Sequence, residues 1–314
     1  MSFAELAAAT NFSFLRGASH PDEMVLTAKA LGLCALGIAD RNTLSGVVRA
    51  HKAAKEADLR LLIGARLVTR CGFEAIAYPC DRAAYGRLCR LLTLGNRRAP
   101  KGQCWLDLED LAAHGEGMVW IAFSGEGVGR FLELGVDRRD VFLALRRTFA
   151  ADDLEQRHAT HALAQKLRIR MVAVGDPLYH SPQRRPLADV LACIREHVTI
   201  DAAGYLLEAH AERHLKPPEE MARLFAGFES ALSAQDEIVG RVRFSLDELA
   251  YEYPDEIGAP GETPIEPLRR LTEAGAKERY PEGVPASVRA AIDHEYGLIE
   301  ELDYAKYFLT VHDI

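Results

Sequence analysis

The stretch that decides the fold lies near the N-terminus and reads Phe3-Ala-Glu-Leu-Ala-Ala-Ala-Thr-Asn-Phe-Ser-Phe-Leu-Arg-Gly-Ala-Ser-His-Pro21. Its first residues, Phe3–Leu6, are an apolar run that predicts a β-strand. At its end, His20-Pro21 is followed by Asp22 and Glu23, which is typical of a helix start because acidic side chains favour the positive end of the helix dipole. The stretch therefore predicts a strand, a loop and a helix.

The chain repeats this order of strand and helix up to Val174, a pattern typical of parallel βαβ units. Strands are expected at Phe3–Leu6, Ala35–Ala39, Leu61–Val68, Phe73–Tyr78, Met118–Phe123, Val141–Leu145 and Arg170–Val174. Helices are expected at Asp22–Ala30, Leu44–Glu56, Arg82–Leu92, Val128–Leu134 and Leu154–Leu167. The sequence thus predicts an α/β fold, a distorted (βα)7 barrel of the TIM kind, in which functional groups lie where strands end.

Helical patterns dominate after Val174, so the barrel is expected to be followed by a mostly helical C-terminal segment. These patterns cover Leu187–Arg195, Pro218–Ala226, Glu229–Val242, Pro264–Tyr280 and Val288–Leu302. Residues 251–264 hold three prolines and two glycines, which predicts an extended connector. We therefore expect a barrel domain with C-terminal helices at 1–250, and a linker with the truncated start of a further domain at 251–314. The final apolar run, Tyr307–Ile314, also predicts a piece of a longer protein.

The composition narrows the class of protein. The chain has 314 residues, 48% of them hydrophobic, which is enough for a large core. A formal charge of −8 argues against a wholly basic nucleic-acid module, although a local basic patch fits. The six cysteines form no Cys-x-x-Cys pair, and no apolar run approaches the roughly 20 residues of a membrane span. We expect a cytoplasmic globular protein that does not contact a membrane.

The N-terminal stretch resembles the first motif of the PHP (polymerase and histidinol phosphatase) domain in bacterial C-family DNA polymerases, which are polymerase III alpha subunit-like. In metal-binding members of that family, the strand carries a His-x-His pair and an Asp precedes the loop glycine. Here these places hold Ala7, Ala9 and Arg16. A methyl group has no lone pair to give a metal, and a guanidinium repels one. The string Asn11–Pro21 is specific to the error-prone, damage-inducible branch, the ImuC type.

Three later segments resemble further PHP motifs. Arg41 stands where metal-binding relatives have a His, next to Asp40, and Arg66 stands where they have a ligand Glu. In Val174–Tyr179, which resembles the late Asp-x-His-Tyr motif, the Asp is kept and the His is replaced. The resemblance implies a degenerate metal pocket and no catalytic, cofactor-binding or metal-binding residue in this chain. The vestigial pocket positions are Ala7, Ala9, Arg16, Asp40, Arg41, Arg66, Asp176 and Leu178.

The arginines at these positions have two possible orientations. If Arg16, Arg41 and Arg66 point into the old pocket, their charges replace the metal ions and pair with Asp40 and Asp176. If they point to solvent, surface ion pairs contribute only about 0–1 kcal/mol each. The inward orientation follows from the motif register.

A basic cluster, Arg97, Arg98 and Lys101, lies in what the sequence predicts to be a loop bounded by proline and glycine. Such a loop could contact nucleic-acid phosphates or an acidic partner surface, and a plain solvated loop is the alternative. If it contacts phosphate, removing the three cations together should flatten the salt dependence of DNA binding by the complete polymerase.

Other candidate sites have simpler interpretations. His158 and His161, and His210 and His214, have the spacing of metal ligands on a helix face, but neither pair has a predicted third ligand. Solvated helix faces are favoured. The glycine-rich segment Ser124–Gly129 could hold a phosphate, yet it lacks a full fingerprint, so a plain turn between strand and helix is favoured.

Two functions compete on this evidence. In the first, the barrel is a catalytically silent structural and docking platform within an error-prone DNA polymerase, a translesion nucleotidyltransferase of the damage (SOS) response. In the second, it is a metal-dependent 3′–5′ exonuclease or phosphoesterase. The resemblance implies Mg²⁺ in the polymerase core of the parent protein and no cofactor in this fragment. It also implies primer-template DNA, deoxynucleotides, the sliding clamp and mutagenic repair accessory proteins as partners.

Overall fold

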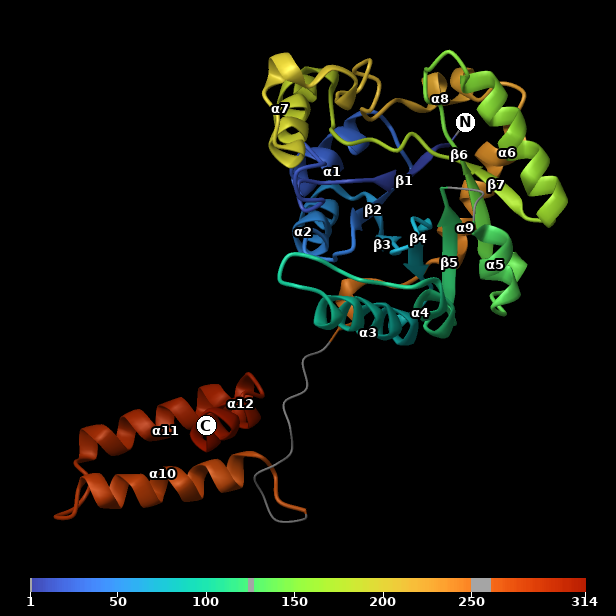
Figure 1. Cartoon of the computed structure of the whole chain (residues 1–314). Helices are drawn as coiled ribbons and strands as arrows, with labels where there is room; N and C mark the ends of the chain where they lie inside the picture. Colours follow the sequence, from blue (N-terminus) through green and yellow to red (C-terminus); the bar gives the residue numbers. More distant parts are fainter. Residues whose placement is uncertain (1, 124–126, 250–260) are drawn as a thin grey trace. The chain divides into compact units, whose positions relative to one another are not determined.

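The computed structural model describes residues 2–123, 127–249 and 261–314, and its first unit is built around one curled sheet (Figure 1). Its seven strands pair in chain order. They are β1 (Ala4–Ala8), β2 (Ala35–Arg41), β3 (Arg60–Val68), β4 (Glu74–Pro79), β5 (Met118–Ala122), β6 (Val141–Leu145) and β7 (Arg170–Ala173). The predicted α/β architecture of seven strands followed by a helical segment is confirmed, and the sheet has the form of a half-barrel.

Strand β4 departs from the prediction of parallel pairing. It runs antiparallel to both β3 and β5, whereas the other neighbouring strands are parallel. The cause is the connection between β3 and β4, where the backbone N–H of Thr69 donates to the carbonyl of Phe73 at 2.9 Å. A parallel crossover needs a dozen or more residues, so this short connection can only reverse the chain.

The opening between β1 and β7 is bridged by a side chain. Among the described residues no ladder joins these two strands. Gln235, buried on helix α9 (Glu229–Arg241), accepts from the backbone N–H of Ala4 at 3.1 Å and donates to the carbonyl of Ala173 at 2.6 Å. Its amide satisfies one unpaired backbone group on each strand, so α9 completes the barrel wall where no further strand is present.

The remaining helices of the first unit surround the sheet. They are α1 (Pro21–Ala30), α2 (Val47–Ala57), α3 (Arg82–Arg98), α4 (Leu108–Ala113), α5 (Val128–Glu133), α6 (Asp153–Leu167), α7 (Arg185–Glu196), α8 (Pro218–Leu224) and α9 (Glu229–Arg241). At the start of α1 the carboxylate of Glu23 accepts from the backbone N–H of His20 at 2.8 Å. The segment 124–126, part of the glycine-rich segment considered above, lies outside the described residues.

Helix α3 is longer than predicted, and this corrects the placement of the basic cluster. Its buried face continues through Leu91 and Leu92 to Gly95, so the helix runs on to Arg98 before Pro100 ends it. Arg97 and Arg98 therefore lie in the last helical turn, where cations favour the negative end of the helix dipole. Only Lys101 lies in the loop that follows.

Tyr78 fills the interior of the curled sheet. Its hydroxyl donates to the carbonyl of Leu6 at 2.7 Å, and the side chain is fully buried. Gly37 and Gly64 make room for the ring, because a Cβ at either position would lie 2.1 Å and 2.6 Å, respectively, from Tyr78 atoms. This packing fixes β1 relative to β2 and β3, and so positions the loops that follow these strands.

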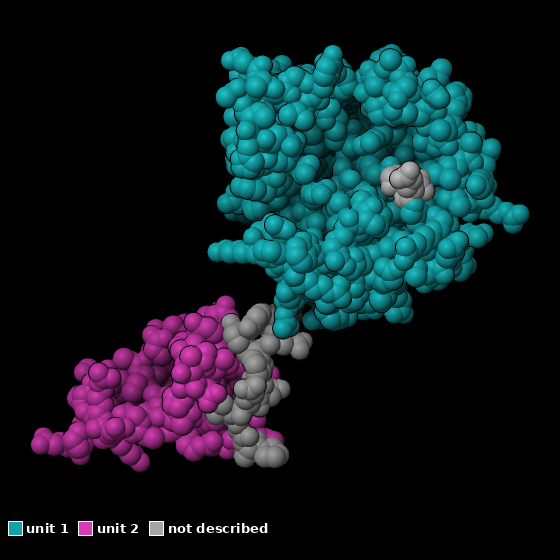
Figure 2. Space-filling model, in the orientation of Figure 1, with its two compact units in different colours: residues 1–249 teal, residues 250–314 magenta. Residues whose placement is uncertain are grey.

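The chain divides into two compact units, 1–249 and 250–314 (Figure 2). The second contains α10 (Ile265–Arg279), α11 (Ala286–Glu301) and α12 (Ala305–Asp313), packed around Leu268, Ile299 and Leu309. Most of the apolar run at 307–314 forms α12. The expected connector at 251–264 falls largely outside the described residues. Of the helices that the structure describes, none combines the length and apolar character needed to cross a membrane.

Candidate functional site

Asp176, just after β7, is the centre of the site. Its side chain is buried, with a residue exposure of 1%, and its backbone is left-handed with φ of 51°. One carboxylate oxygen accepts from Arg66, and the other accepts from Arg213 at 2.8 Å and Arg146 at 3.2 Å. Burial alone would raise the pKa of Asp176, but the charges of Arg213, Arg66 and Arg146 lower it to about 2. One carboxylate is thus held by three guanidinium groups.

Arg66 reaches this carboxylate from β3. The residue is 9% exposed, and its guanidinium also pairs with Glu74 at 3.1 Å. It stacks on the ring of Phe123, with 4.1 Å from the guanidinium carbon to the ring centroid, and one nitrogen lies 3.5 Å from the Ala7 carbonyl. The structure therefore brings Ala7, Arg66 and Asp176 together, in the inward arrangement that the motif register predicts.

Arg146 and Arg213 were not found by sequence reasoning. Arg146 follows β6, and Arg213 lies in the loop before α8, where its Nε also donates to the Asp176 carbonyl at 2.7 Å. Neither belongs to a recognisable motif. Arginine after an apolar strand, as in Leu145-Arg146, is the one signal that could have indicated a residue at the barrel mouth.

Glu5 on β1 is a second buried carboxylate that the sequence analysis missed. It accepts from the backbone N–H groups of Ala7 and Gly175, each at 2.8 Å, and so links β1 to the segment after β7. Burial, reinforced by the charge of Asp176, raises the pKa of Glu5 to about 7 despite these hydrogen bonds. The sequence did contain a sign of this residue, because Glu5 is the one carboxylate among the apolar residues of the predicted strand Phe3–Leu6.

Asp40, at the end of β2, does not pair with an arginine, so that expectation is wrong. Its carboxylate accepts four hydrogen bonds, from the backbone and hydroxyl groups of Thr10 and Ser13, at 2.6–3.1 Å. No cation among the described residues lies within 4.0 Å of it. Burial raises the pKa of Asp40 above its usual range although all four hydrogen bonds oppose this. The loop after β1 folds over Asp40 and excludes a guanidinium.

Arg16 and Arg41 also differ from the expectation, because neither joins the Asp176 cluster. Together with Arg195 of α7, they line a separate cleft of about 800 Å³. Burial and the neighbouring charges of Arg41 and Arg195 lower the pKa of Arg16. Burial also lowers the pKa of Arg41, against the charge of Glu74 and with that of Arg66. Here positive charges lie near one another rather than around a carboxylate.

The remaining residues singled out in the sequence lie at the barrel mouth, at the end of α3 or in the cleft. The backbone N–H of Ala9 donates to the Pro177 carbonyl at 3.0 Å, and that of Leu178 donates to the Arg213 carbonyl at 2.9 Å. Both positions therefore contribute backbone contacts to the barrel mouth. Arg98 pairs with Asp110 at 2.5 Å, Arg97 is exposed, and Lys101 lines the cleft.

The histidine pairs have ordinary structural contacts. The rings of His158 and His161 lie 6.3 Å and 6.1 Å from that of Phe228. His210 is hydrogen-bonded through Nε2 to the Thr148 carbonyl at 2.8 Å. Burial, followed by the charge of Lys216, lowers the pKa of His214 to about 4. His158 and His161 lie on helix α6, in agreement with the simpler interpretation. His210 and His214 lie in the loop before α8, so the expectation of a shared helix face is wrong for this pair.

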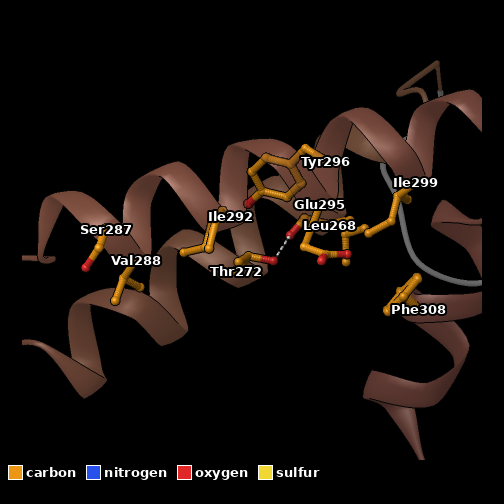
Figure 3. A pocket seen from close by; sticks show the side chains of 10 residues that line it. Leu268, Thr272, Ser287, Val288, Ile292, Glu295, Tyr296, Ile299 and Phe308 are labelled. Carbon is orange, nitrogen blue, oxygen red and sulfur yellow. Dashed lines mark hydrogen bonds between the residues drawn. The ribbon is translucent and has the colours of Figure 1, made fainter.

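The second unit has a hollow of a different kind, about 460 Å³ in volume (Figure 3). Its lining is mostly apolar and includes Ile292, Tyr296, Ile299 and Phe308, and the hydroxyl of Thr272 donates to its own helix. Of the described residues that line it, Glu295 is the one that carries a charge. The described lining of this hollow is therefore mostly apolar, with few polar groups that could bind or react with a ligand.

Comparisons with known proteins show the family to which this chain belongs. Residues 5–156 match the PHP domain family, and residues 266–314 match the family described as the bacterial DNA polymerase III alpha NTPase domain. The error-prone DNA polymerase of Caulobacter vibrioides is 48% identical over 319 residues, covering 99% of this chain and 30% of that protein. The chain is the PHP domain and N-terminal region of the error-prone DNA polymerase family. Error-prone DNA polymerase 1 of Rhizobium meliloti is also 48% identical, over 99% of this chain and 29% of its own length.

The chain thus spans just under a third of the curated relatives it matches. Among solved structures, a metal-dependent phosphoesterase from Bifidobacterium adolescentis is similar to part of this chain. Its TM-score is 0.43 and its identity 17%, over 56% of this chain and 87% of that one.

The residues of this PHP domain do not fit a metal cluster. No group of three or more histidine, cysteine, aspartate or glutamate side chains in the described part of the chain could hold a metal ion. Asp176 is occupied by guanidinium groups, and Glu5 by backbone N–H groups. Ala7 and Leu178 provide no side-chain lone pair.

Proposed function

We propose that the PHP domain of this chain has lost its metal site and serves as a non-catalytic structural and docking platform in an error-prone DNA polymerase. The observation that carries the proposal is the Asp176 carboxylate, because both of its oxygens are occupied by guanidinium groups. A divalent ion at this position would have to approach three positive charges and displace them. The phosphoesterase chemistry of metal-binding relatives needs several ions, each held by N or O donors. The described residues contain no group of side chains that could supply such a set of donors.

The arginine cluster provides a structural link of the kind that bound metals would provide. Arg66 comes from β3, Arg146 follows β6, Arg213 precedes α8, and all three meet a residue that follows β7. Breaking such a buried set is costly because it leaves charges without partners. Four segments that are distant in sequence are therefore joined at one point, which supports a rigid platform.

The remainder of the proposal concerns the parent protein. Residues 251–314 would be a linker and the start of the polymerase core, which is supported by the family match at 266–314. Nucleotidyl transfer on damaged templates, with its Mg²⁺, would take place in a part of the protein outside these 314 residues. The partners would be primer-template DNA, deoxynucleotides, the sliding clamp and accessory proteins of mutagenic repair, in the cytoplasm.

Metal analysis and a nuclease assay test this function. The purified chain is analysed for Zn, Mn and Fe and incubated with labelled single-stranded DNA and Mn²⁺. We expect no stoichiometric metal and no cleavage by the wild type, by Asp176→Asn, or by the control Asp137→Asn, in which an exposed carboxylate paired with Arg139 is changed. Stoichiometric metal together with cleavage lost only in Asp176→Asn would contradict the proposal and establish the exonuclease or phosphoesterase instead.

A further inference from the structure

The cleft beside the arginine cluster concentrates positive charge in an acidic chain. Among the residues that the structure describes, four cations line it, namely Arg16, Arg41, Lys101 and Arg195, and no carboxylate belongs to its lining. They come from four different segments: the loop after β1, the end of β2, the loop after α3 and the end of α7. The chain as a whole has a formal charge of −8, so this gathering is local and specific.

Three of these cations have no counter-ion in the part of the chain that the structure describes. Within the described residues, the side chains of Arg16, Arg41 and Lys101 have no carboxylate within 4.0 Å, whereas Arg195 pairs with Glu196 at 2.8 Å. The lowered pKa values of Arg16 and Arg41 reflect burial of their guanidinium groups and repulsion from neighbouring arginines. An anion in the cleft would relieve this repulsion and gain charge-assisted hydrogen bonds.

Three aromatic side chains line the same cleft, namely Phe12, Phe14 and Trp105. Phe14 is 79% exposed and Trp105 is 39% exposed, and the indole N–H of Trp105 donates to Gln103 at 3.1 Å, which fixes the ring. Neutral hydrogen-bonding groups are also present, including Asn42 and Thr43. Positive charges, aromatic faces and amides in one groove match what a single nucleic-acid strand presents, while free phosphate or an acidic peptide needs no stacking surface.

The loop that carries Phe14 and Arg16 is held in a defined conformation. Asp40 binds its start through Thr10 and Ser13, and Arg195 donates to the Leu15 carbonyl at 2.8 Å. Gly17 permits the loop to fold back, because a Cβ there would lie 2.0 Å from the Thr10 carbonyl oxygen. Preorganisation of this kind reduces the entropic cost of binding.

We propose that this cleft binds a short stretch of single-stranded DNA without cleaving it, with Arg16, Arg41 and Lys101 at phosphates and Phe14 and Trp105 stacked on bases. The inference rests on the proposed function only in its choice of DNA as the strand. The volume of about 800 Å³ is that of a small-ligand pocket, which suits a few unpaired nucleotides rather than a duplex.

Fluorescence anisotropy of the full 314-residue chain with labelled oligothymidylate of about ten nucleotides tests the cleft, at several salt concentrations. We expect Arg16→Ala/Arg41→Ala/Lys101→Ala to weaken binding at least about tenfold. The slope of log K against log salt should become shallower by about 2, since each phosphate contact on a single strand contributes about 0.7. Phe14→Ala should weaken binding about fivefold or more with an unchanged slope, because stacking is not ionic.

The matched control removes three arginines elsewhere: Arg130→Ala/Arg139→Ala/Arg223→Ala, each exposed and paired with a carboxylate. Unchanged binding in this control, and partial rescue of the cleft by Arg16→Lys, Arg41→Lys and Lys101→Arg, would support the proposal. Equal loss in both triple variants, preference for duplex DNA, or equal affinity for polyglutamate would overturn it. Circular dichroism verifies folding. These outcomes are independent of the metal and nuclease measurements, so either proposal can fail alone.

Discussion

Two groups of arginines in the first unit have opposite electrostatic environments. At the barrel mouth, Arg66, Arg146 and Arg213 surround one buried carboxylate. In the cleft, Arg16 and Arg41 lie near Arg195 with no carboxylate of their own among the described residues. An arginine at one of these positions can therefore neutralise a buried carboxylate or leave a positive site for an external anion. The surrounding loop, rather than the arginine itself, decides between these outcomes.

The largest expected effect on stability comes from removing the Asp176 carboxylate, which the first group of arginines surrounds. Asp176→Ala should lower the free energy of unfolding by about 3–5 kcal/mol, because the buried Arg66 and the partly buried Arg213 then lose their shared carboxylate, whereas Arg146 is exposed. Urea denaturation followed by tryptophan fluorescence measures this for the first unit alone, since both tryptophans, Trp105 and Trp120, lie in it. The exposed Asp137→Ala serves as control and should unfold at the wild-type urea concentration. A similar small shift for both variants would show that the cluster is only a set of surface pairs.

A second effect concerns Glu5, the carboxylate beside Asp176, and depends on pH. Its pKa is raised from 4.5 to about 7, so between these two pH values the folded chain keeps the proton on Glu5 while the unfolded chain releases it. This difference lowers the free energy of unfolding. The loss is absent below pH 4.5 and grows to about 3 kcal/mol as the pH rises to 7. Glu5→Gln removes this titration.

The stability of Glu5→Gln relative to wild type should therefore increase between pH 4.5 and 7, by roughly 3 kcal/mol. Denaturation curves at intervals across this range measure the difference. Asp176 does not interfere, because its lowered pKa of about 2 places its own stability loss at more acidic pH. A difference that stays constant with pH would mean that Glu5 is ionised in the folded state.

The sequence predicted the strands well because each is an apolar run bounded by polar or turn residues. It did not predict their direction, since an apolar run reads the same in both orientations. The reversal of β4 follows from the few residues between the predicted strands Leu61–Val68 and Phe73–Tyr78. That spacing was visible, and it excludes a crossover helix.

The site was predictable only where a motif fixed the register. Arg66 and Asp176 were identified in this way, and the structure places them in contact. Arg146 and Arg213 come from segments without a motif, so nothing in the sequence connected them with Asp176. Asp40 was expected to pair with arginine, but its partners belong to a loop whose path depends on tertiary packing. Local patterns locate charged residues, whereas their partners depend on how the loops fold.

A third and smaller effect tests how Asp40 supports the cleft. Asp40→Asn keeps the size of the side chain but replaces one acceptor oxygen with an N–H₂ group that faces hydrogen-bond donors. We expect a loss of about 1–3 kcal/mol in unfolding free energy. Trypsin should also cleave faster after Arg16, because the loop is less firmly held. Asp58→Asn, a change of an exposed carboxylate at the end of α2, is the control. Unchanged cleavage at Arg16 would show that Asp40 does not hold this loop.

The smallest expected effect separates the members of the basic cluster at the end of α3. Arg98 is already paired with Asp110, so Arg98→Ala should change stability by no more than about 1 kcal/mol and leave the salt dependence of DNA binding unchanged. Lys101→Ala should make the slope of log K against log salt shallower by about 0.7, because Lys101 lines the cleft and has no carboxylate within 4.0 Å among the described residues. Arg97→Ala, in the same helical turn as Arg98, is the matched control. If Arg98→Ala and Lys101→Ala flatten the slope equally, the contact with DNA follows the whole basic cluster, and the distinction between paired and unpaired cations does not determine where a strand binds.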